Sequence, residues 1–511
     1  MRESGILLPV FSLPSRYGIG CFSAEAREFI DQLARSGQHY WQILPLTPPA
    51  EGNSPYTPVS TFAGNPCFID PESLVHANLL SRADLEPVEK ALRDVPDDTI
   101  DYKLVSRLRK PLLKKAFGRF RPSHSYERFC RSNAYWLDDV SLYSALATWF
   151  READWHYWPK EIKYREKDAV AFYREHLKWE IEYYKWTQFE FTKEWKKICR
   201  YAHKKGIRII GDMPIYTSMQ GADCWAHPEI FQLDEDLDAE SVSGCPPDSF
   251  SPDGQLWGNP LYDWDGNRDA VFRWWEERVR LSFRLYDVIR IDHFRGLAAY
   301  YSIPRGKTPF DGTWIPGPGI DLFRTLEKSV RGTKFLAEDL GLITDDVKEL
   351  LAECGFPGMK VLQFAFDSDE TNPYLPDNFG TTSCVVYTGT HDNDTTRGWY
   401  GSLDEDKKAF VERVLRKHLQ TPAYYCPDPL TPENIAGAMT ALAETSTADL
   451  CIIPMGDLLN LGSEARINTP AGSGKNWRWR MKPEELTAQS FRLVKWLTEQ
   501  AGRTENADGK A

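Results

Sequence analysis

The chain has 511 residues, enough to bury a large core, and a formal net charge of −12 at pH 7. An acidic protein is poorly suited to bind nucleic acid or an anionic membrane surface, so we expect neither partner and favour a neutral substrate. Aromatic residues make up 13% of the chain, which favours a concave site lined by flat apolar side chains, although a large core also holds many aromatics.

Features near the start of the chain and its cysteines predict a cytoplasmic protein. The opening residues contain neither a long apolar stretch nor a small-residue cleavage site, so no signal peptide is predicted. No apolar run approaches the roughly 18 residues that a membrane span needs. The 10 cysteines are scattered without Cys-x-x-Cys pairs, which indicates reduced thiols and argues against a zinc site.

Short apolar runs that end in polar residues or in Gly and Pro recur along the chain, and most precede a helical pattern. Such alternation predicts parallel βαβ units, and eight of them close into a (β/α)8 barrel. The eight predicted strands are residues 5–10, 40–46, 207–212, 288–292, 335–338, 360–364, 384–388 and 450–454. This count depends on interpretation, because a short apolar run can also be a buried turn of helix.

The predicted helices and insertions fill the intervals between these strands. Helices are expected from Ser23 to near Gly37, over 268–285 and over 404–419. Residues 70–190 have a mostly helical pattern and are predicted to form an insertion after the second strand. Residues 217–267, rich in Gly, Pro and Asp, are predicted to form a lid after the third strand. Residues 1–511 would thus form one interrupted catalytic barrel, with a disordered tail over 502–511.

Acidic side chains follow three of the predicted strands. The three segments are Arg290-Ile-Asp292-His293, Ala337-Glu338-Asp339 and Thr390-His391-Asp392-Asn393-Asp394. In a parallel barrel the active site forms at the carboxyl ends of the strands. Two carboxyl groups that flank a bond, with a third nearby, are typical of glycoside chemistry.

Asp292 and Glu338 are the candidate nucleophile and acid/base. Arg290 lies two residues before Asp292, hence on the same face of the strand, and its guanidinium would keep Asp292 ionised. The alternative is a structural Arg–Asp pair. Glu338 could act as the acid/base, with Asp339 raising its pKa; alternatively it caps a helix.

His391 and Asp392 are candidates for gripping the hydroxyl groups of a distorted sugar ring. For His391 alone, a core or metal-binding histidine is the commoner explanation. Three strand ends that carry the same pattern, with Asp212 as a fourth, together favour an active site over these separate alternatives.

The motifs Arg-x-Asp-His, Ala-Glu-Asp-Leu-Gly and Thr-His-Asp-Asn resemble those of the α-amylase clan of retaining barrel enzymes. Residues 211–216, Gly-Asp-Met-Pro-Ile-Tyr, differ from the usual amylase motif and match the 4-α-glucanotransferase (amylomaltase, or disproportionating enzyme) family. The similarity runs nearly end to end, from Gly5-Ile-Leu-Leu through Tyr40-Trp-Gln-Ile-Leu-Pro-Leu and Gly254-Gln-Leu-Trp-Gly-Asn-Pro to Gly462-Ser-Glu-Ala-Arg-Ile-Asn-Thr-Pro.

This resemblance implies transfer of α-1,4-glucan segments between maltooligosaccharides, without metal or organic cofactor; it does not indicate an oligomeric state. It implies that Asp292 is the nucleophile, Glu338 the general acid/base and Asp392 a transition-state stabiliser. A retaining pair would hold its carboxyl groups about 5 to 5.5 Å apart. The implied substrate-binding residues are Tyr56, Asp212, Arg290 and His391 at the donor sugar, Ser54 and Asp369 on the acceptor side, Trp257 with the loop around Phe250 over the glucan, and Asn468.

Three positions depart from the family pattern. Gln220-Gly-Ala-Asp223 stands where Asp-Ser-Ala-Asp is common, Asp377 where a His often follows Leu-Pro, and Met455-Gly456 where a Gln usually precedes Asp457. The catalytic set is intact, but the acceptor-side preference is left open.

Rival interpretations are a hydrolase of α-1,4-glucans, a catalytically silent glucan-binding protein, and a metal enzyme built on His293 and His391. The metal enzyme would need a tight ligand motif such as His-Glu-x-x-His, which the sequence lacks. The hydrolase would be recognised by free glucose rising in step with total reducing ends.

Overall fold

Eight parallel strands form the centre of the molecule. The computed structural model describes residues 2–50, 52–247, 251–341, 343–421, 424–470, 472 and 474–504. The strands are β1 (Glu3–Leu7), β2 (Tyr40–Gln42), β3 (Arg208–Met213), β6 (Val288–Ile291), β9 (Phe335–Ala337), β10 (Gly358–Val361), β11 (Cys384–Tyr387) and β14 (Leu450–Pro454). Each overlaps one of the eight predicted runs, although β1 and β10 begin two residues before the predicted start.

The strands are hydrogen-bonded in the order β10-β11-β14-β1-β2-β3-β6-β9. The two ends of this sheet approach each other, because the backbone N–H of Ala337 at the end of β9 donates to the carbonyl of Pro357, just before β10, at 3.0 Å. The sheet is therefore a nearly closed barrel, and the predicted fold class is confirmed. Across its interior, the hydroxyl of Tyr387 on β11 donates to Oε1 of Gln42 on β2 at 2.9 Å.

Several observed strands are shorter than predicted. The sixth strand ends at Val361, and Leu362–Phe366 form a turn of 3-10 helix instead of continuing to 364. The first strand ends at Leu7, and Pro9 precedes another 3-10 turn at Val10–Ser12. An apolar run therefore marks a strand correctly here but overestimates its length.

Helices lie between most consecutive barrel strands along the chain, except that 3-10 turns take their place between β10 and β11. The helices are α1 (Ala24–Arg35), α8 (Lys178–Lys204), α10 (Arg268–Ser282), α12 (Gly319–Ser329), α13 (Asp345–Cys354), α15 (Glu405–His418), α16 (Ile435–Thr445) and α18 (Arg492–Gln500). In α1, Ala26, Phe29, Ile30 and Leu33 recur at helical spacing and are all buried, and each of the three larger side chains contributes about 1.5–3 kcal/mol of burial. The chain then turns at Gly37, whose φ of 73° lies in the left-handed region that favours glycine.

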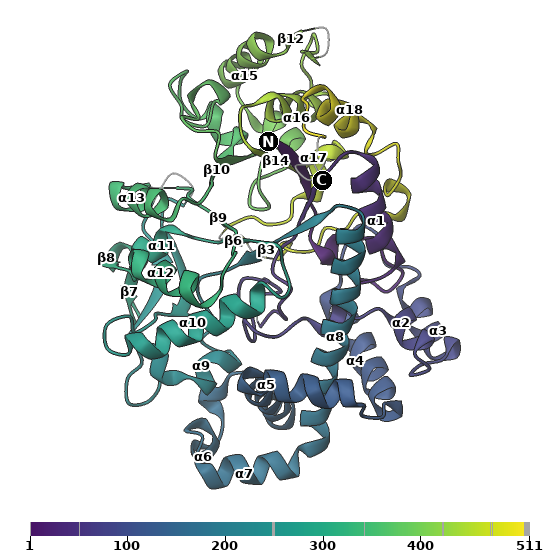
Figure 1. The fold of residues 1–511 in the computed structure, drawn as a ribbon, viewed down its shortest axis with the longest axis vertical. Helices are drawn as coiled ribbons and strands as arrows, with labels where there is room; N and C mark the ends of the chain where they lie inside the picture. The colour runs from purple at the N-terminus through teal and green to yellow at the C-terminus, as the bar shows by residue number, and fades with distance from the viewer. Residues whose placement is uncertain are drawn as a thin grey trace.

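Between β2 and β3 the chain forms a group of helices beside the barrel. They are α2 (Pro71–His76), α3 (Arg82–Leu92), α4 (Tyr102–Arg119), α5 (His124–Phe150), α6 (Lys160–Lys163) and α7 (Lys167–His176), followed by α8. Figure 1 shows α5, α6 and α7 at one end of the long axis and α15 at the other, with the barrel strands between them.

A second, antiparallel sheet has the strand order β5-β4-β7-β8. Two of its strands, β4 (Ser241–Cys245) and β5 (Gln255–Pro260), lie between β3 and β6, together with the short helix α9 (Ala222–Ala226). The other two, β7 (Ala299–Pro304) and β8 (Thr313–Pro316), follow β6 and the short helix α11 (Arg295–Ala298). The sequence pattern did not indicate β7 and β8, so part of this sheet comes from outside residues 217–267.

The remaining α-helices and strands follow β11 and β14 in the chain. They are α14 (Thr396–Ser402), the pair β12 (Gln420–Thr421) and β13 (Tyr424–Tyr425), and α17 (Met455–Leu458). None of the helices in the described part of the chain is long and apolar enough to cross a membrane. Within the same residues no disulfide joins the cysteines, and Cys384 and Cys451 are buried.

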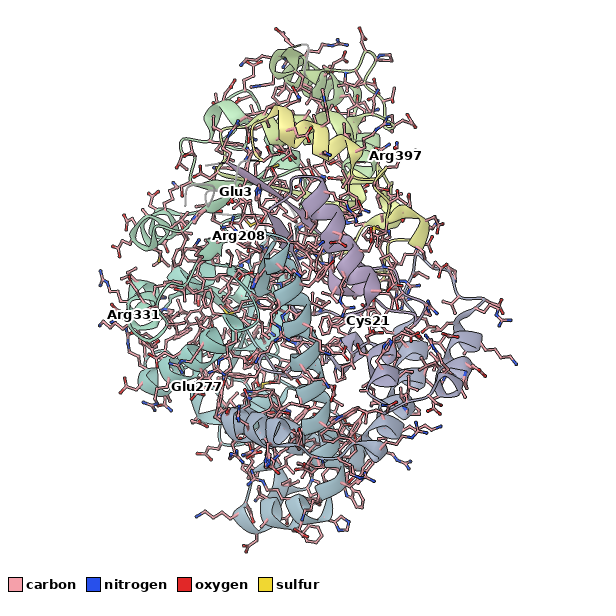
Figure 2. The ribbon with its side chains drawn as sticks, turned by 45° about the vertical axis from the view of Figure 1, so that its right-hand side comes forward. Glu3, Cys21, Arg208, Glu277, Arg331 and Arg397 are labelled. Carbon is pink, nitrogen blue, oxygen red and sulfur yellow. The ribbon has the colours of Figure 1, made fainter. Side chains whose placement is uncertain are left out.

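An ion pair and a buried arginine connect distant segments of the chain at the amino-terminal edge of the barrel. Arg208 at the start of β3 pairs with Glu3 at the start of β1 and covers the ring of Tyr40 at 4.3 Å, and Figure 2 shows Glu3 and Arg208 close together at this edge. Arg503 is fully buried nearby and donates to the carbonyl oxygens of Glu3, Glu444 and Ser446. The predicted disordered tail is therefore wrong for residues 502–504, and its remainder, 505–511, lies outside the described residues.

Candidate active site

The candidate nucleophile and acid/base follow neighbouring strands. In the barrel, β6 lies between β3 and β9, with Ile291 opposite Ala337 in the ladder. Asp292 and Glu338 are the next residues on these two strands, so they emerge side by side at the carboxyl edge. Asp212 on β3 is opposite Arg290 on β6. The third carboxylate, Asp392, lies in the loop that follows β11.

A single guanidinium nitrogen of Arg290 connects two of the carboxylates. Its Nη1 donates to Oδ1 and Oδ2 of Asp212 and to Oδ1 of Asp292, each at 2.8 Å. The side chain of Asp212 is fully buried, whereas that of Asp292 is 25% exposed. The Arg290–Asp212 pair is thus part of the barrel interior, while Asp292 is oriented by the same arginine and still reaches the surface of the site.

Glu338 is held by backbone donors. The N–H of His293 donates to its Oε2 at 2.6 Å and the N–H of Leu340 to its Oε1 at 3.2 Å. It does not cap a helix, because the next helix begins at Asp345. Burial, assisted by the negative charge of Asp292, raises the pKa of Glu338 to about 8.

Asp339 does not have the predicted role of raising the pKa of Glu338. Its Oδ1 accepts a hydrogen bond of 2.6 Å from the backbone N–H of Met359 on β10. The neighbouring carboxylate that raises the pKa of Glu338 is Asp292. Successive side chains on an extended strand point to opposite faces, and for this reason Asp339 lies on the other side of the chain from Glu338.

Asp292 and Glu338 interact electrostatically, because the negative charge of Asp292 helps to raise the pKa of Glu338. Burial raises the pKa of Asp292 to about 7, and the adjacent Arg290 acts in the opposite direction. Because the guanidinium donates directly to Asp292 while Glu338 receives only backbone N–H groups, the first proton leaves Asp292. The singly ionised pair has Asp292 as the carboxylate and Glu338 as the acid.

His293 has a positioning role that sequence reasoning missed. Its φ of 51° is in the left-handed region, which a non-glycine residue seldom adopts. This conformation accompanies the hydrogen bond from its N–H to Glu338. The centroids of the His293 and Trp257 rings are 4.7 Å apart, with the rings edge to face. Burial lowers the pKa of His293 to about 3, so its imidazole is neutral. In the sequence, His293 stands out only as the last residue of the Arg-x-Asp-His motif and as a possible metal ligand.

Asp392 is held from two directions. Its Oδ1 accepts a 2.6 Å hydrogen bond from Nδ2 of Asn468 and lies 3.4 Å from Nε2 of His391. His391 is buried, which lowers its pKa and leaves the ring neutral. Tyr56 stacks on His391 at 5.1 Å and donates through its hydroxyl to Oδ2 of Asp212 at 2.7 Å. Through Tyr56, the loop after β2 thereby connects His391, which lies beside Asp392, with Asp212 on β3.

The other predicted substrate-binding residues, Ser54, Trp257 and Asp369, lie outside this group of carboxylates and have contacts of their own. Oγ of Ser54 accepts a hydrogen bond from the N–H of Tyr56 at 3.2 Å, so it shapes the loop that carries Tyr56. Trp257 is partly exposed beside His293. Asp369 is exposed, and its carboxylate accepts local hydrogen bonds from Thr371. Phe250 itself and the two residues before it lie outside the described residues.

The three departures from the family pattern lie outside the carboxylate centre. Gln220 donates to Oδ2 of Asp154 at 3.3 Å. Asp377 pairs with Lys417 at 2.6 Å near the surface. Asp457, which follows Met455 and Gly456 in the chain, accepts hydrogen bonds from Thr388 and Thr396. In the part of the chain that the structure describes, no three His, Cys, Asp or Glu residues form a group that could hold a metal ion.

The site defines the class of protein. An arginine-paired carboxylate and a carboxyl group of raised pKa on adjacent strand ends of a parallel barrel, with a third carboxylate nearby, are the arrangement of enzymes that act on glycosidic bonds.

Comparisons with known proteins identify the family. A family model described as 4-alpha-glucanotransferase matches residues 8–487. The 4-alpha-glucanotransferase of Clostridium butyricum is 44% identical over 97% of this chain and 100% of its own length, and that of Thermus thermophilus is 40% identical over 98% and 99%. The amylomaltase of Streptococcus agalactiae, solved in complex with acarbose, is 36% identical, superposes with a TM-score of 0.92, and covers 98% of this chain and 100% of its own.

The chain belongs to glycoside hydrolase family 77, the 4-alpha-glucanotransferases of the α-amylase clan. It is a 4-alpha-glucanotransferase, EC 2.4.1.25, that acts on alpha-glucans. The family and the activity predicted from the motifs are thereby confirmed.

Proposed function

We propose that the chain transfers segments of α-1,4-glucans to the 4-hydroxyl of an acceptor glucan or glucose by a retaining double displacement. The observation that carries this proposal is the paired state of Asp292 and Glu338, in which Arg290 orients the ionised carboxylate and burial keeps its neighbour protonated. In the first step Oδ of Asp292 attacks the anomeric carbon of the donor sugar. The bond from that carbon to the glycosidic oxygen breaks, and the proton of Glu338 moves to the departing oxygen.

Formation of the ester prepares Glu338 for the second step. The negative charge of Asp292, which contributes to the raised pKa of Glu338, disappears when its oxygen becomes part of an ester. The pKa of Glu338 then falls, so its carboxylate can accept the proton of the incoming 4-hydroxyl. The acceptor oxygen attacks the anomeric carbon, Asp292 leaves as a carboxylate, and two inversions give net retention.

The surrounding residues would bind the donor sugar. Tyr56, Asp212, Arg290 and His391 form one continuous set of contacts, and Asp392 opens to solvent with 43% of its side chain exposed. In this proposal Asp392 accepts hydrogen bonds from ring hydroxyls, which strengthen as the anomeric carbon becomes positive. Asn468, also predicted as a substrate-binding residue, donates to Oδ1 of Asp392, and we assign it the further role of orienting this carboxylate.

Transfer rather than hydrolysis requires that a sugar, not water, reaches the ester. Trp257 on β5 lies against His293, the residue that follows the nucleophile. We assign it to the acceptor glucan, with Ser54 and Asp369 as further acceptor-side residues. An aromatic surface here holds the acceptor and excludes water.

The free buried thiols Cys384 and Cys451 suit the reducing cytoplasm that we propose as the location.

Maltotriose alone tests the proposal. Separation of products by size over time should show maltopentaose and longer chains together with glucose, and product NMR should show retained α-configuration. Glucose and maltose without longer chains would overturn transfer, whereas β-anomeric products would overturn the double displacement.

A further inference from the structure

The segment after α17 is tied to the loop that carries Asp392. Oγ of Ser463 donates to Oδ2 of Asp394 at 2.6 Å. The backbone N–H of Asn468 donates to the carbonyl of His391 at 3.0 Å. Segments about 75 residues apart in the chain therefore share one hydrogen-bonded junction at the edge of the site.

Arg466 lies at the centre of this junction. Its Nη2 donates to the carbonyl oxygen of Asp392 and its Nε to the carbonyl oxygen of Asn468, both at 2.8 Å. The side chains of Asp392 and Asn468 also contact each other, because Nδ2 of Asn468 donates to Oδ1 of Asp392 at 2.6 Å. One rigid guanidinium thus fixes both backbones from which that side-chain contact is built.

We propose that Arg466 is a positioning residue for the transfer reaction, acting through Asp392. This inference rests on the role of Asp392 in the proposed mechanism. With both backbones fixed, Asn468 and His391 meet Oδ1 of Asp392, and the rotation of the carboxylate is set so that Oδ2 is presented to the donor sugar. The alignment is made before the substrate arrives, so it does not have to be gained during the reaction.

The chemistry of arginine is needed for this role. Nε and Nη2 point in parallel from one plane and can reach two carbonyl oxygens at once, whereas the ammonium group of lysine is a single point of charge. In the described residues Arg466 has no carboxylate within ion-pair distance, and its bonds go to backbone carbonyls. Replacement by lysine therefore keeps the charge but loses the geometry.

The experiment measures kcat and KM for maltotriose disproportionation in Arg466→Lys and Arg466→Ala. A misplaced catalytic group costs on the order of 10²-fold in rate, so we expect kcat to fall by about that factor with KM changed by less than about 3-fold. Millimolar guanidinium should restore part of kcat in Arg466→Ala. Arg480→Lys is the matched control, because Arg480 also donates from Nε and a second nitrogen to two backbone carbonyls, those of Asp97 and Ser15. It should lower Tm but leave kcat unchanged.

A double-mutant cycle separates positioning from a general structural role. If Arg466 acts through Asp392, adding Arg466→Ala to Asp392→Asn should cause no further loss of kcat. Losses that multiply, or an Arg466→Ala enzyme with at least half of the wild-type kcat, would overturn the inference while leaving the mechanism intact. An Asp392→Asn enzyme with full kcat would overturn both the inference and the proposed role of Asp392.

Discussion

Replacing Asp292 by Asn removes a negative charge beside Glu338 and should lower the pKa of Glu338. Two unit charges about 5.5 Å apart, the spacing of a retaining pair, interact by about 3 kcal/mol at an effective dielectric constant of about 20, or about 2 pKa units. The pKa of Glu338, about 8 in the wild type, should therefore fall to roughly 6 in Asp292→Asn. The amide also models the loss of charge in the glycosyl ester, so this shift measures the change that turns the acid into a base.

Carbon-13 NMR with glutamate labelled at the carboxyl carbon provides the assay. The signal of Glu338 is identified by its loss in Glu338→Gln, in both the wild-type and the Asp292→Asn backgrounds. Asp339→Asn is the matched control, because its carboxylate is bonded to the N–H of Met359; it should shift the pKa of Glu338 by well under one unit. A pKa in Asp292→Asn within about half a unit of the wild-type value would refute the electrostatic argument.

The profile of kcat/KM against pH should be bell-shaped with a maximum near about 7.5: activity falls below pH about 7, as Asp292 becomes protonated, and above about 8, as Glu338 loses its proton. A flat profile between pH 5 and 9 would contradict this assignment. Asp292→Asn should lower kcat by on the order of 10⁴-fold or more with an unchanged circular-dichroism spectrum; substantial residual turnover would exclude it as the nucleophile. Trp257→Ala should raise the ratio of glucose released by water to longer chains formed, because acceptor binding weakens more than the chemistry, and an unchanged ratio would count against the role of Trp257. Arg503→Ala leaves Glu444 buried without its cation and should cost about 3 kcal/mol of unfolding free energy in calorimetry without changing kcat; an unaltered Tm would show that the buried contacts are dispensable.

The sequence by itself indicated the candidate catalytic residues. The alternation of apolar runs with helical patterns predicted eight parallel strands, and Asp292 and Glu338 were recognised because they follow two of them. The period of two along a strand also placed Arg290 beside Asp292. Local sequence determines these features, since strand formation and the face on which a side chain lies depend on near neighbours in the chain.

Tertiary structure decided how these residues are paired. That Arg290 is shared with Asp212, and that the charge next to Glu338 belongs to Asp292 rather than Asp339, depends on which strands become neighbours in the closed barrel. Likewise, the hydrogen bond from the N–H of His293 to Glu338 is made at a residue with a left-handed backbone. Apolar periodicity contains no information on either point, because strand order and backbone conformation at a loop are set by packing between distant segments.

The same limit applies to the periphery of the site. The motif around Arg466 and Asn468 was visible in the sequence, but its attachment to the loop of Asp392 was not. Strands β7 and β8 complete the second sheet although they are separated from β4 and β5 by a barrel strand. Contacts between segments far apart in sequence form where the folded chain brings them together, and they decided which side chains support the carboxylates that the sequence had already identified.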